Sequence, residues 1–373
     1  MTLYCHQPML QCIKSTLRME KNVNFAGWKS KIMEKKNFSD IGKIEAINQL
    51  FAASSFKQSD STAFLCGESG NVIRTASRMW LEGIDFDLTY FPLKHLGYKC
   101  VVGTVGGLYA SLARPQSISV RIGISAKLDL PQITELWSGI CAAAEEHHIK
   151  KADLDLIPSR NGLSISIVIT GIESREVAEN RKSANSKDLV CISGSVGAAF
   201  LGMSILESEK KKFEKAGSLT GQPDIERYKM LVGAYLKPEI APDLPGQFSD
   251  SGIRPSYGYL VDRGLADAVK RLQRDSGLGV KIYTDKIPFE GNSFEAGKRL
   301  NIDPVSAALN GGDDFRLLYV IPMSMYETFR HDFQTFSIIG HMAKPEVGAA
   351  IVTTEGAELP VRAQGWPREE EEQ

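Results

Sequence analysis

Segments with helical spacing of apolar residues alternate with strand-like segments along most of this 373-residue chain. In a strand every second side chain shares a face, whereas in a helix the shared positions recur every three or four residues, so the two patterns are distinct. Residues 92–112 are a long apolar helix candidate, residues 130–147 have helical spacing, and residues 117–125 and 163–170 alternate as strands. Because strands and helices alternate, the predicted fold class is α/β or α+β.

The second half of the sequence continues the same alternation. We predict strands at 188–194, 280–283, 315–321 and 336–340, and helices at 196–207, 264–275 and 323–333. A further helix is predicted near the start, at 41–51, and a lysine-rich polar insertion at 208–222.

The length exceeds that of one ordinary hydrophobic core and suits two domains. The charge-rich stretch 173–187 has the composition of a connection between domains. We therefore expect the chain to be divided into four parts. These are a basic N-terminal extension (1–37), an N-terminal α/β domain (38–180), a C-terminal α/β domain (181–366) and an acidic tail (367–373).

Composition excludes several classes of protein. The net charge of −1 and the pI near 6.6 provide no overall basic field, so we expect neither nucleic acid nor a membrane as a partner. No apolar run is long enough to span a bilayer, and the N-terminus lacks the pattern of a signal peptide. The six cysteines contain no C-x-x-C pair, which favours free thiols in a cytoplasmic protein.

The most distinctive local motif is Asn-Gly-Gly-Asp-Asp-Phe at 310–315, directly before a predicted strand. Two glycines permit a tight turn, which places Asp313 and Asp314 at the edge of a strand. Carboxylates in such a turn suit a divalent cation or a substrate ammonium group. The alternative is an ordinary hairpin turn.

Other motifs each have a structural alternative. Asp85 and Asp87 have the spacing of one strand face, or else lie at a solvated strand edge. The turn around Gly194 leads from a strand into a helix, where phosphate groups bind well, but a plain turn has the same pattern. Glycines within 102–107 indicate either close backbone approach or loss of a former side chain. His147 and His148 point about 100° apart on a helix, so we do not expect them to share a metal ion.

Taken in order, several segments resemble thiamine-monophosphate kinases, of the aminoimidazole-ribonucleotide-synthetase-like superfamily. The similar segments are Asp40-Ile-Gly, Glu82-Gly-Ile-Asp-Phe-Asp-Leu-Thr-Tyr, Leu236-Lys-Pro-Glu, Asn310-Gly-Gly-Asp-Asp-Phe, Ile339-Gly-His-Met and Gln364-Gly-Trp. The resemblance implies a two-domain fold in which the N-terminal sheet pairs with that of a second subunit. It also implies Mg²⁺ and ATP as cofactors in phosphoryl transfer to thiamine monophosphate.

The resemblance also assigns candidate site residues. The residual metal-binding candidates are Glu68, Asp155, Asp313 and Asp314. Nucleotide or phosphate binding is carried over to Gly194, Gly311 and Gly312, together with Glu68 and Asp155.

Most metal-binding acids of this family are replaced here. Arg78 stands where the family has an acid, Gly107 stands at another acidic position, and the family's Asp-Ile-Ser-Asp-Gly-Leu reads Leu260-Val-Asp-Arg263-Gly-Leu. A shift of the alignment could let Asp262 replace the acid lost at 260. An arginine about 4 Å from a divalent cation opposes metal binding. Each unit charge pair contributes about 4 kcal/mol of repulsion at an effective dielectric constant of about 20.

Three hypotheses follow from these departures. The first is a catalytically impaired homologue that keeps the fold and binds nucleotide or thiamine phosphate, with Arg78 and Arg263 as phosphate-binding candidates. The second is an active kinase with a reorganised metal site built from Glu68, Asp155, Asp313 and Asp314. The third is a scaffold subunit that binds no ligand.

Overall fold

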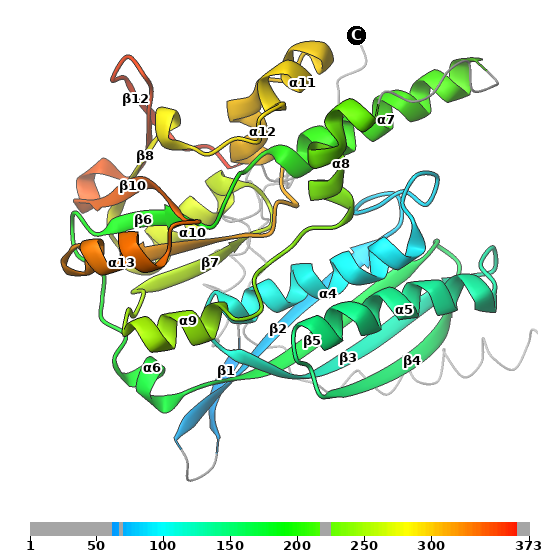
Figure 1. Cartoon of the computed structure of the whole chain (residues 1–373), viewed down its shortest axis with the longest axis horizontal. Coiled ribbons are helices and arrows are strands. Elements are labelled where there is room, and N and C mark those ends of the chain that lie inside the picture. Colours follow the sequence, from blue (N-terminus) through cyan, green and yellow to red (C-terminus); the bar gives the residue numbers. More distant parts are fainter. Residues whose placement is uncertain (1–61, 67–69, 217–224, 364–373) are drawn as a thin grey trace, which may run out of the picture.

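The structure is a computed structural model, and it describes residues 62–66, 70–216 and 225–363. The predicted extension (1–37), helix (41–51), candidate Glu68 and acidic tail (367–373) lie outside the described residues, as do the segments at 40–42 and 364–366. Two β-sheets with their helices make up the described part of the chain (Figure 1). No helix in that part is long and apolar enough to cross a membrane.

The first sheet is built from the N-terminal half of the chain. Its strands, in spatial order, are β1 (Thr62–Cys66), β2 (Asn71–Leu81), β5 (Ser164–Glu173), β3 (Arg114–Ser125) and β4 (Lys151–Ser159). β3 and β4 are parallel, and the other neighbours are antiparallel. Helices α4 (Leu93–Tyr109) and α5 (Leu130–Glu146) pack on this sheet, which confirms the predicted strands at 117–125 and 163–170 and the helices beside them (Figure 1).

The second sheet is built from the C-terminal half. Its order is β12 (Glu358–Pro360), β11 (Ala349–Val352), β8 (Gly279–Tyr283), β10 (Ser337–Ala343), β6 (Leu189–Ile192), β9 (Arg316–Ile321) and β7 (Tyr257–Val261). Only β8 and β11 are parallel among the paired strands of this sheet.

The remaining helices of the described residues follow β5 along the chain. They are α6 (Arg175–Glu179), α7 (Ala198–Ala216), α8 (Lys229–Leu236), α9 (Leu244–Ser251), α10 (Leu265–Ser276), α11 (Ser293–Leu300), α12 (Pro304–Asn310) and α13 (Tyr326–Asp332). Single 3-10 turns lie at Glu226–Tyr228, Thr284–Lys286, Met323–Met325 and Pro345–Val347. The C-terminal strands and helices predicted from periodicity are thus present, whereas the domain boundary at 180/181 remains a prediction.

Two local predictions were wrong. The helix predicted at 196–207 does not end there, because α7 continues through the polar stretch to Ala216 with glutamates and lysines, which are good helix formers. Asp85 and Asp87 do not lie on a strand, since β2 ends at Leu81. Instead, the Asp85 carboxylate accepts a hydrogen bond from Leu81 N at 2.8 Å, and Asp87 accepts one from Thr89 N, as short acidic side chains do in turns.

Helix α4 contacts strands of both sheets and therefore joins the two halves of the molecule. Its glycines permit this close approach. A Cβ atom on Gly103 would lie 2.7 Å from Trp80 of β2 and 2.8 Å from Phe315, which precedes β9. Trp80 and Phe315 belong to one buried core that contains residues of both halves. Of the two interpretations of these glycines, the geometry supports close approach of the α4 backbone to its neighbours.

Candidate functional site

Five charged residues meet where α4 lies against both halves. We call Arg78, Lys99, Asp85, Asp262 and Asp313 the charge cluster. Arg78 comes from β2 and Lys99 from α4, while Asp85 follows β2. Asp262 directly follows β7, and Asp313 lies between α12 and β9. The cluster therefore joins two cations of the N-terminal half to two carboxylates of the C-terminal half.

The guanidinium of Arg78 is surrounded by carboxylates. It donates to Asp262 Oδ2 at 3.0 Å and to Asp313 Oδ1 at 3.2 Å, and it lies 3.7 Å from Asp85 Oδ1. The side chain is only 10% exposed and stacks on the Trp80 ring, 4.2 Å from its centroid. Burial lowers the pKa of Arg78, but the three carboxylates outweigh burial and raise the pKa above its ordinary value. Arg78 is therefore a fixed positive charge at this point.

Lys99 supplies a second cation to the same carboxylate. Its side chain is fully buried, and its Nζ lies 2.9 Å from Asp313 Oδ2 and 3.6 Å from the centroid of the Tyr235 ring. The contact with Asp313 is an ion pair without the alignment of a hydrogen bond. Burial lowers the pKa of Lys99, and the Asp313 carboxylate opposes that effect. Both oxygens of Asp313 thus face a cation of the protein itself.

The adjacent acid, Asp314, points elsewhere. It is buried beneath the start of α7, where its carboxylate accepts hydrogen bonds from Gly197 N at 2.7 Å and Ala199 N at 3.1 Å. Burial raises the pKa of Asp314 to about 6, although these two hydrogen bonds favour the ionised form. The backbone donors at the start of α7 are thus used by an internal carboxylate, in the region where a phosphate-binding turn was predicted.

The glycines of the predicted site shape these turns. Gly312 has φ +86°, a conformation that favours glycine, and Asp313 follows with φ +61° while its N–H donates to Asp262 O at 2.8 Å. A Cβ on Gly311 would lie 2.5 Å from Phe200 Cβ. Gly194 also has a positive φ, at +121°, and the side chain of Arg316 lies over it. These glycines therefore serve close packing and turn geometry.

The remaining candidates lie apart from the charge cluster or at its rim. Asp155 is exposed on the edge strand β4, where it accepts a hydrogen bond from Leu156 N. Arg263 is 53% exposed and lies 3.9 Å from Asp262 Oδ2. Lys99 was not selected from the sequence, although it had a signal: it is the only charged residue in the apolar stretch 96–109.

This set of donors does not fit a magnesium cluster. Mg²⁺ requires near-octahedral oxygen ligation, but Asp313 faces two cations, Asp262 lies between Arg78 and Arg271, and Asp314 caps a helix. Within residues 62–66, 70–216 and 225–363, no three His, Cys, Asp or Glu side chains are grouped so that they could hold a metal ion.

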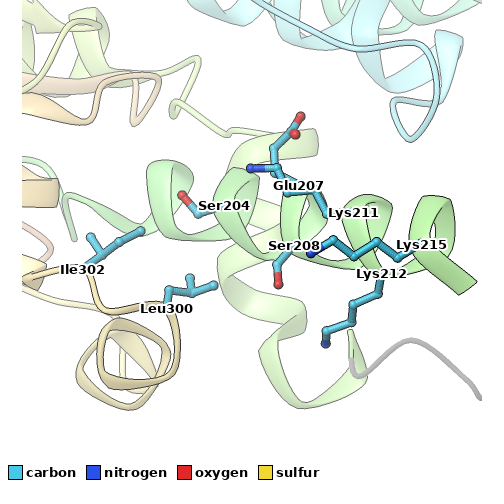
Figure 2. Close-up of a pocket in the computed structure, with 8 residues that line it drawn as sticks. All are labelled: Ser204, Glu207, Ser208, Lys211, Lys212, Lys215, Leu300 and Ile302. Atoms are coloured by element: carbon cyan, nitrogen blue, oxygen red, sulfur yellow. The ribbon is translucent and has the colours of Figure 1, made fainter. Parts of the chain in front are cut away.

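A separate cavity of about 500 Å³ lies along α7, and we call it the α7 cavity (Figure 2). Lys211, Lys212 and Lys215 line it from α7, and Leu300 and Ile302 line it from the opposite side. Lys212 pairs with Glu209 at 2.6 Å. The other two lysines make no ion pair with the described residues, and Glu207 also lines the cavity, so the charge of its lining is positive on balance.

The sequence of this chain is similar to those of several thiamine-monophosphate kinases. No protein-family model matches it. The thiamine-monophosphate kinase of Buchnera aphidicola is 23% identical over 331 residues, covering 86% of this chain and 91% of the relative. The Aquifex aeolicus enzyme is 22% identical over 251 residues, covering 66% and 75%.

Solved structures agree with the sequence relatives. A structure described as AaThiL complexed with AMPPCP and TMP has a TM-score of 0.72 at 19% identity, and covers 89% of this chain and 98% of its own. The hydrogenase maturation protein HypE in complex with ATP has a TM-score of 0.57 at 17% identity, with 86% and 90% covered. The chain is therefore a divergent homologue of the thiamine-monophosphate kinases, and it has their fold.

Proposed function

We propose that this chain is a catalytically impaired homologue of the thiamine-monophosphate kinases that retains the binding of a phosphate-bearing ligand. The observation that carries the proposal is the pairing of Asp313 with two buried or nearly buried cations, Arg78 and Lys99. In phosphoryl transfer of this kind, metal ions neutralise charge on the transferring group. Here Asp313, the first acid of the best-preserved motif, is already paired with cationic side chains of the protein itself.

Electrostatics supports the loss of metal-dependent chemistry. At about 4 Å and an effective dielectric of about 20, each unit charge pair contributes about 4 kcal/mol. A divalent cation at Asp313 would meet this repulsion from both Arg78 and Lys99. It would also have to displace contacts of 3.2 and 2.9 Å. Reorganisation of the site around Asp155 is not favoured, since that residue lies on the exposed edge strand β4.

For the retained binding, the α7 cavity has suitable charge. Lys211 and Lys215 are four residues apart and therefore lie on the same face of α7. Ammonium groups in this arrangement bind phosphate as point charges. The volume of about 500 Å³ is within the range of small-molecule sites. The relevant ligands are nucleotides and thiamine phosphates, because a structural neighbour is described as complexed with AMPPCP and TMP.

Calorimetric titration tests this proposal directly. Purified protein is titrated with ATP and with thiamine monophosphate, each with and without Mg²⁺, and formation of thiamine diphosphate is measured in parallel. We expect binding that does not require Mg²⁺ and no product. Metal-dependent ATP binding with turnover would establish an active kinase instead. Absence of binding by either ligand would leave the scaffold hypothesis.

A matched pair of variants assigns the binding site. Lys211→Ala combined with Lys215→Ala should weaken phosphate binding at least tenfold. Lys229→Ala serves as the control, because this lysine is 67% exposed on α8 and pairs with Glu226. Equal binding by both variants would remove the α7 cavity from the proposal.

The proposed function includes a homodimer formed through the first sheet. Its support is the edge strand β4, on which Leu154, Leu156 and Ile157 are 40%, 45% and 51% exposed. An open edge that carries apolar side chains is a surface for pairing with another strand. Light scattering should give the mass of a dimer, and Leu156→Asp should give the mass of a monomer.

A further inference from the structure

A cavity of about 580 Å³ lies at the edge of the second sheet where β6 ends and β9 begins. We call it the Arg316 cavity. Ser193 and Arg316 line it from this edge, while α9 with the loop before it and α13 with the turn after it form the other walls. None of its lining residues belongs to the charge cluster or to the α7 cavity, so this is a separate candidate site.

The guanidinium of Arg316 is held in one orientation by the backbone. Its Nε donates to Ser195 O at 3.1 Å, and its Nη1 donates to Glu239 O at 3.3 Å. A Cβ on Gly194 would lie 3.5 Å from Arg316 Cζ, so the guanidinium is also packed against that turn. Because three segments of the chain contact it, this side chain presents its remaining donors in a fixed position in the cavity wall.

Arg316 keeps both unused donors and an unpaired charge. A guanidinium has five N–H groups, and two of them bond to these carbonyls, so three have no acceptor among the described residues. No described carboxylate lies within ion-pair distance of it. It acts on the Asp314 carboxylate only from further away, and that carboxylate is bonded to Gly197 N. A partly buried cation is normally paired, which indicates an anion from outside the chain.

Ser193 supplies a second donor beside the guanidinium. Its Oγ accepts a hydrogen bond from Leu317 N at 2.8 Å, and its own N–H donates to Leu317 O at 3.0 Å. Since Leu317 follows Arg316 in β9, these bonds fix the hydroxyl next to the guanidinium. The hydroxyl hydrogen has no acceptor among the described residues, so it is available to a ligand. Ser193 and Arg316 are both partly exposed, and a molecule in the cavity can therefore reach them.

The rest of the lining is apolar close to these donors. Ile240, Leu244 and Leu317 are 7%, 4% and 0% exposed, and the ring of Phe336 completes this part of the wall. A volume of about 580 Å³ is within the range of small-molecule sites. Apolar walls around a few fixed donors suit a ligand that has one charged end and an apolar body.

The acids of the lining limit the charge of the ligand. Glu239 pairs with Lys237 at 3.2 Å, and Asp332 pairs with His331 at 2.7 Å. These two carboxylates do not neutralise Arg316, but they would repel a second negative charge in the cavity. One unpaired cation in the lining therefore favours a monoanion over a dianion.

We propose that the Arg316 cavity binds a small monocarboxylic acid with an apolar body. The carboxylate accepts hydrogen bonds from Arg316 and from the Ser193 hydroxyl, and the apolar body packs against Leu244 and Phe336. The planar guanidinium matches the geometry of a carboxylate, which makes such hydrogen bonds strong and directional. The site lies outside the α7 cavity, so the proposal does not depend on retained phosphate binding there.

Calorimetric titration with four probes tests the ligand chemistry. Phenylacetate has the charge and the apolar body, acetate lacks the body, phenylacetamide lacks the charge, and phenyl phosphate carries a second negative charge. We expect phenylacetate to bind at least tenfold more tightly than each of the other three. If phenylacetate does not bind, or if any other probe binds as tightly, the proposal is overturned.

A matched pair of arginine variants locates the binding. Arg316→Gln should weaken the binding of phenylacetate at least tenfold. Arg330→Gln is the control, because Arg330 lies on α13 outside the cavity lining and donates to the Tyr326 hydroxyl at 3.1 Å. This control removes the same charge and should leave the affinity unchanged. Binding that survives Arg316→Gln, or that falls equally in both variants, contradicts the assignment.

A cavity-filling variant gives the same decision should Arg316→Gln not fold. Thr335 lines the cavity from the turn after α13, where its side chain is exposed and makes no hydrogen bond with the described residues. Thr335→Trp therefore takes up volume in the cavity without removing a contact of the fold. The affinity for phenylacetate should fall at least tenfold, and an unchanged affinity would overturn the proposal.

Discussion

Arg78 occupies the position that decides whether carboxylates at this site can hold a metal ion. It contacts Asp262, Asp313 and Asp85, and each of these could otherwise face a divalent cation. We predict that Arg78→Asp makes the protein bind Mg²⁺, because it replaces the guanidinium by a further oxygen ligand. In 10 mM Mg²⁺ the variant should gain about 1 kcal/mol of stability by linkage, measured as a rise in Tm, and the unsubstituted protein should gain none.

The control for this change is Arg263→Asp. It alters the net charge by the same amount at a side chain that is 53% exposed and 3.9 Å from Asp262. A response to Mg²⁺ in the control, or in the unsubstituted protein, would show that the charge cluster does not exclude the metal.

Asp314 should make stability depend on pH between about 4 and 6. Burial raises its pKa from the ordinary 3.8 to about 6, so the folded state holds the proton more tightly than the unfolded state. The free energy of unfolding should therefore fall as pH rises through this window and stay level above it. Two pKa units correspond to roughly 3 kcal/mol.

Urea unfolding of Asp314→Asn beside the unsubstituted protein isolates this contribution. The difference in unfolding free energy between the two should change by roughly 3 kcal/mol from pH 4 to pH 7. Asp303→Asn is the control for the loss of a helix cap, because Asp303 accepts hydrogen bonds from Val305 N and Ser306 N at the exposed start of α12. If the difference for Asp314→Asn does not vary with pH, ionisation of the Asp314 carboxylate does not destabilise the folded protein.

At the scale of elements, Gly103 determines how closely α4 approaches β2 and β9. A Cβ there would lie 2.7 Å from Trp80 Cζ2 and 2.8 Å from Phe315 Cε1. Gly103→Ala should destabilise the fold by about 1–3 kcal/mol through overpacking, although alanine is the better helix former. Gly233→Ala on α8 should be neutral or stabilising by up to about 1 kcal/mol, since no atom lies within 4 Å of its Cβ position. Chemical denaturation of both variants compares the two effects, and equal stability would contradict the packing argument.

Periodicity predicted the elements that bury one regular face, and it missed the others. The strand at 114–125 was predictable because its buried residues Ile118, Val120 and Ile122 alternate. The helix at 93–109 was predictable as one long apolar run, because it is buried on nearly every side. β4 was not, because eight of its nine residues are exposed at the sheet edge and impose no alternation. β2 was missed for the related reason that its buried positions, Ala76 and Trp80, are few.

The residues of the candidate site could be predicted from the sequence, but the contacts between them could not. The sequence identified Asp313 and Asp314 as a turn with two acids, and it identified Arg78 as a cation in place of an acid. It could not show that adjacent acids diverge, because Asp314 is held by Gly197, 117 residues away, and Asp313 by Arg78, 235 residues away. Lys99 joins the same group only through the packing of α4 between the halves.

At the scale of the whole molecule, the charge cluster joins the two halves. Lys99 belongs to the N-terminal half and Asp313 to the C-terminal half, and the pair is fully buried on the lysine side and 20% exposed on the other. Removal of one partner leaves a poorly solvated charge, which is strongly destabilising in buried pairs. The stability of each half should therefore depend on the other through this contact.

A double-mutant cycle of Lys99→Met and Asp313→Asn measures that dependence. Asparagine tolerates the left-handed backbone at 313, so the second change removes the charge without backbone strain. We expect an interaction energy of about 2 kcal/mol in the free energy of unfolding. The same cycle for Lys281 and Glu358, an ion pair within the second sheet in which the glutamate is 49% exposed, should give less than about 1 kcal/mol. If the two cycles give equal values, apolar packing between the halves is sufficient, and the cations at Asp313 then serve only to occupy its carboxylate.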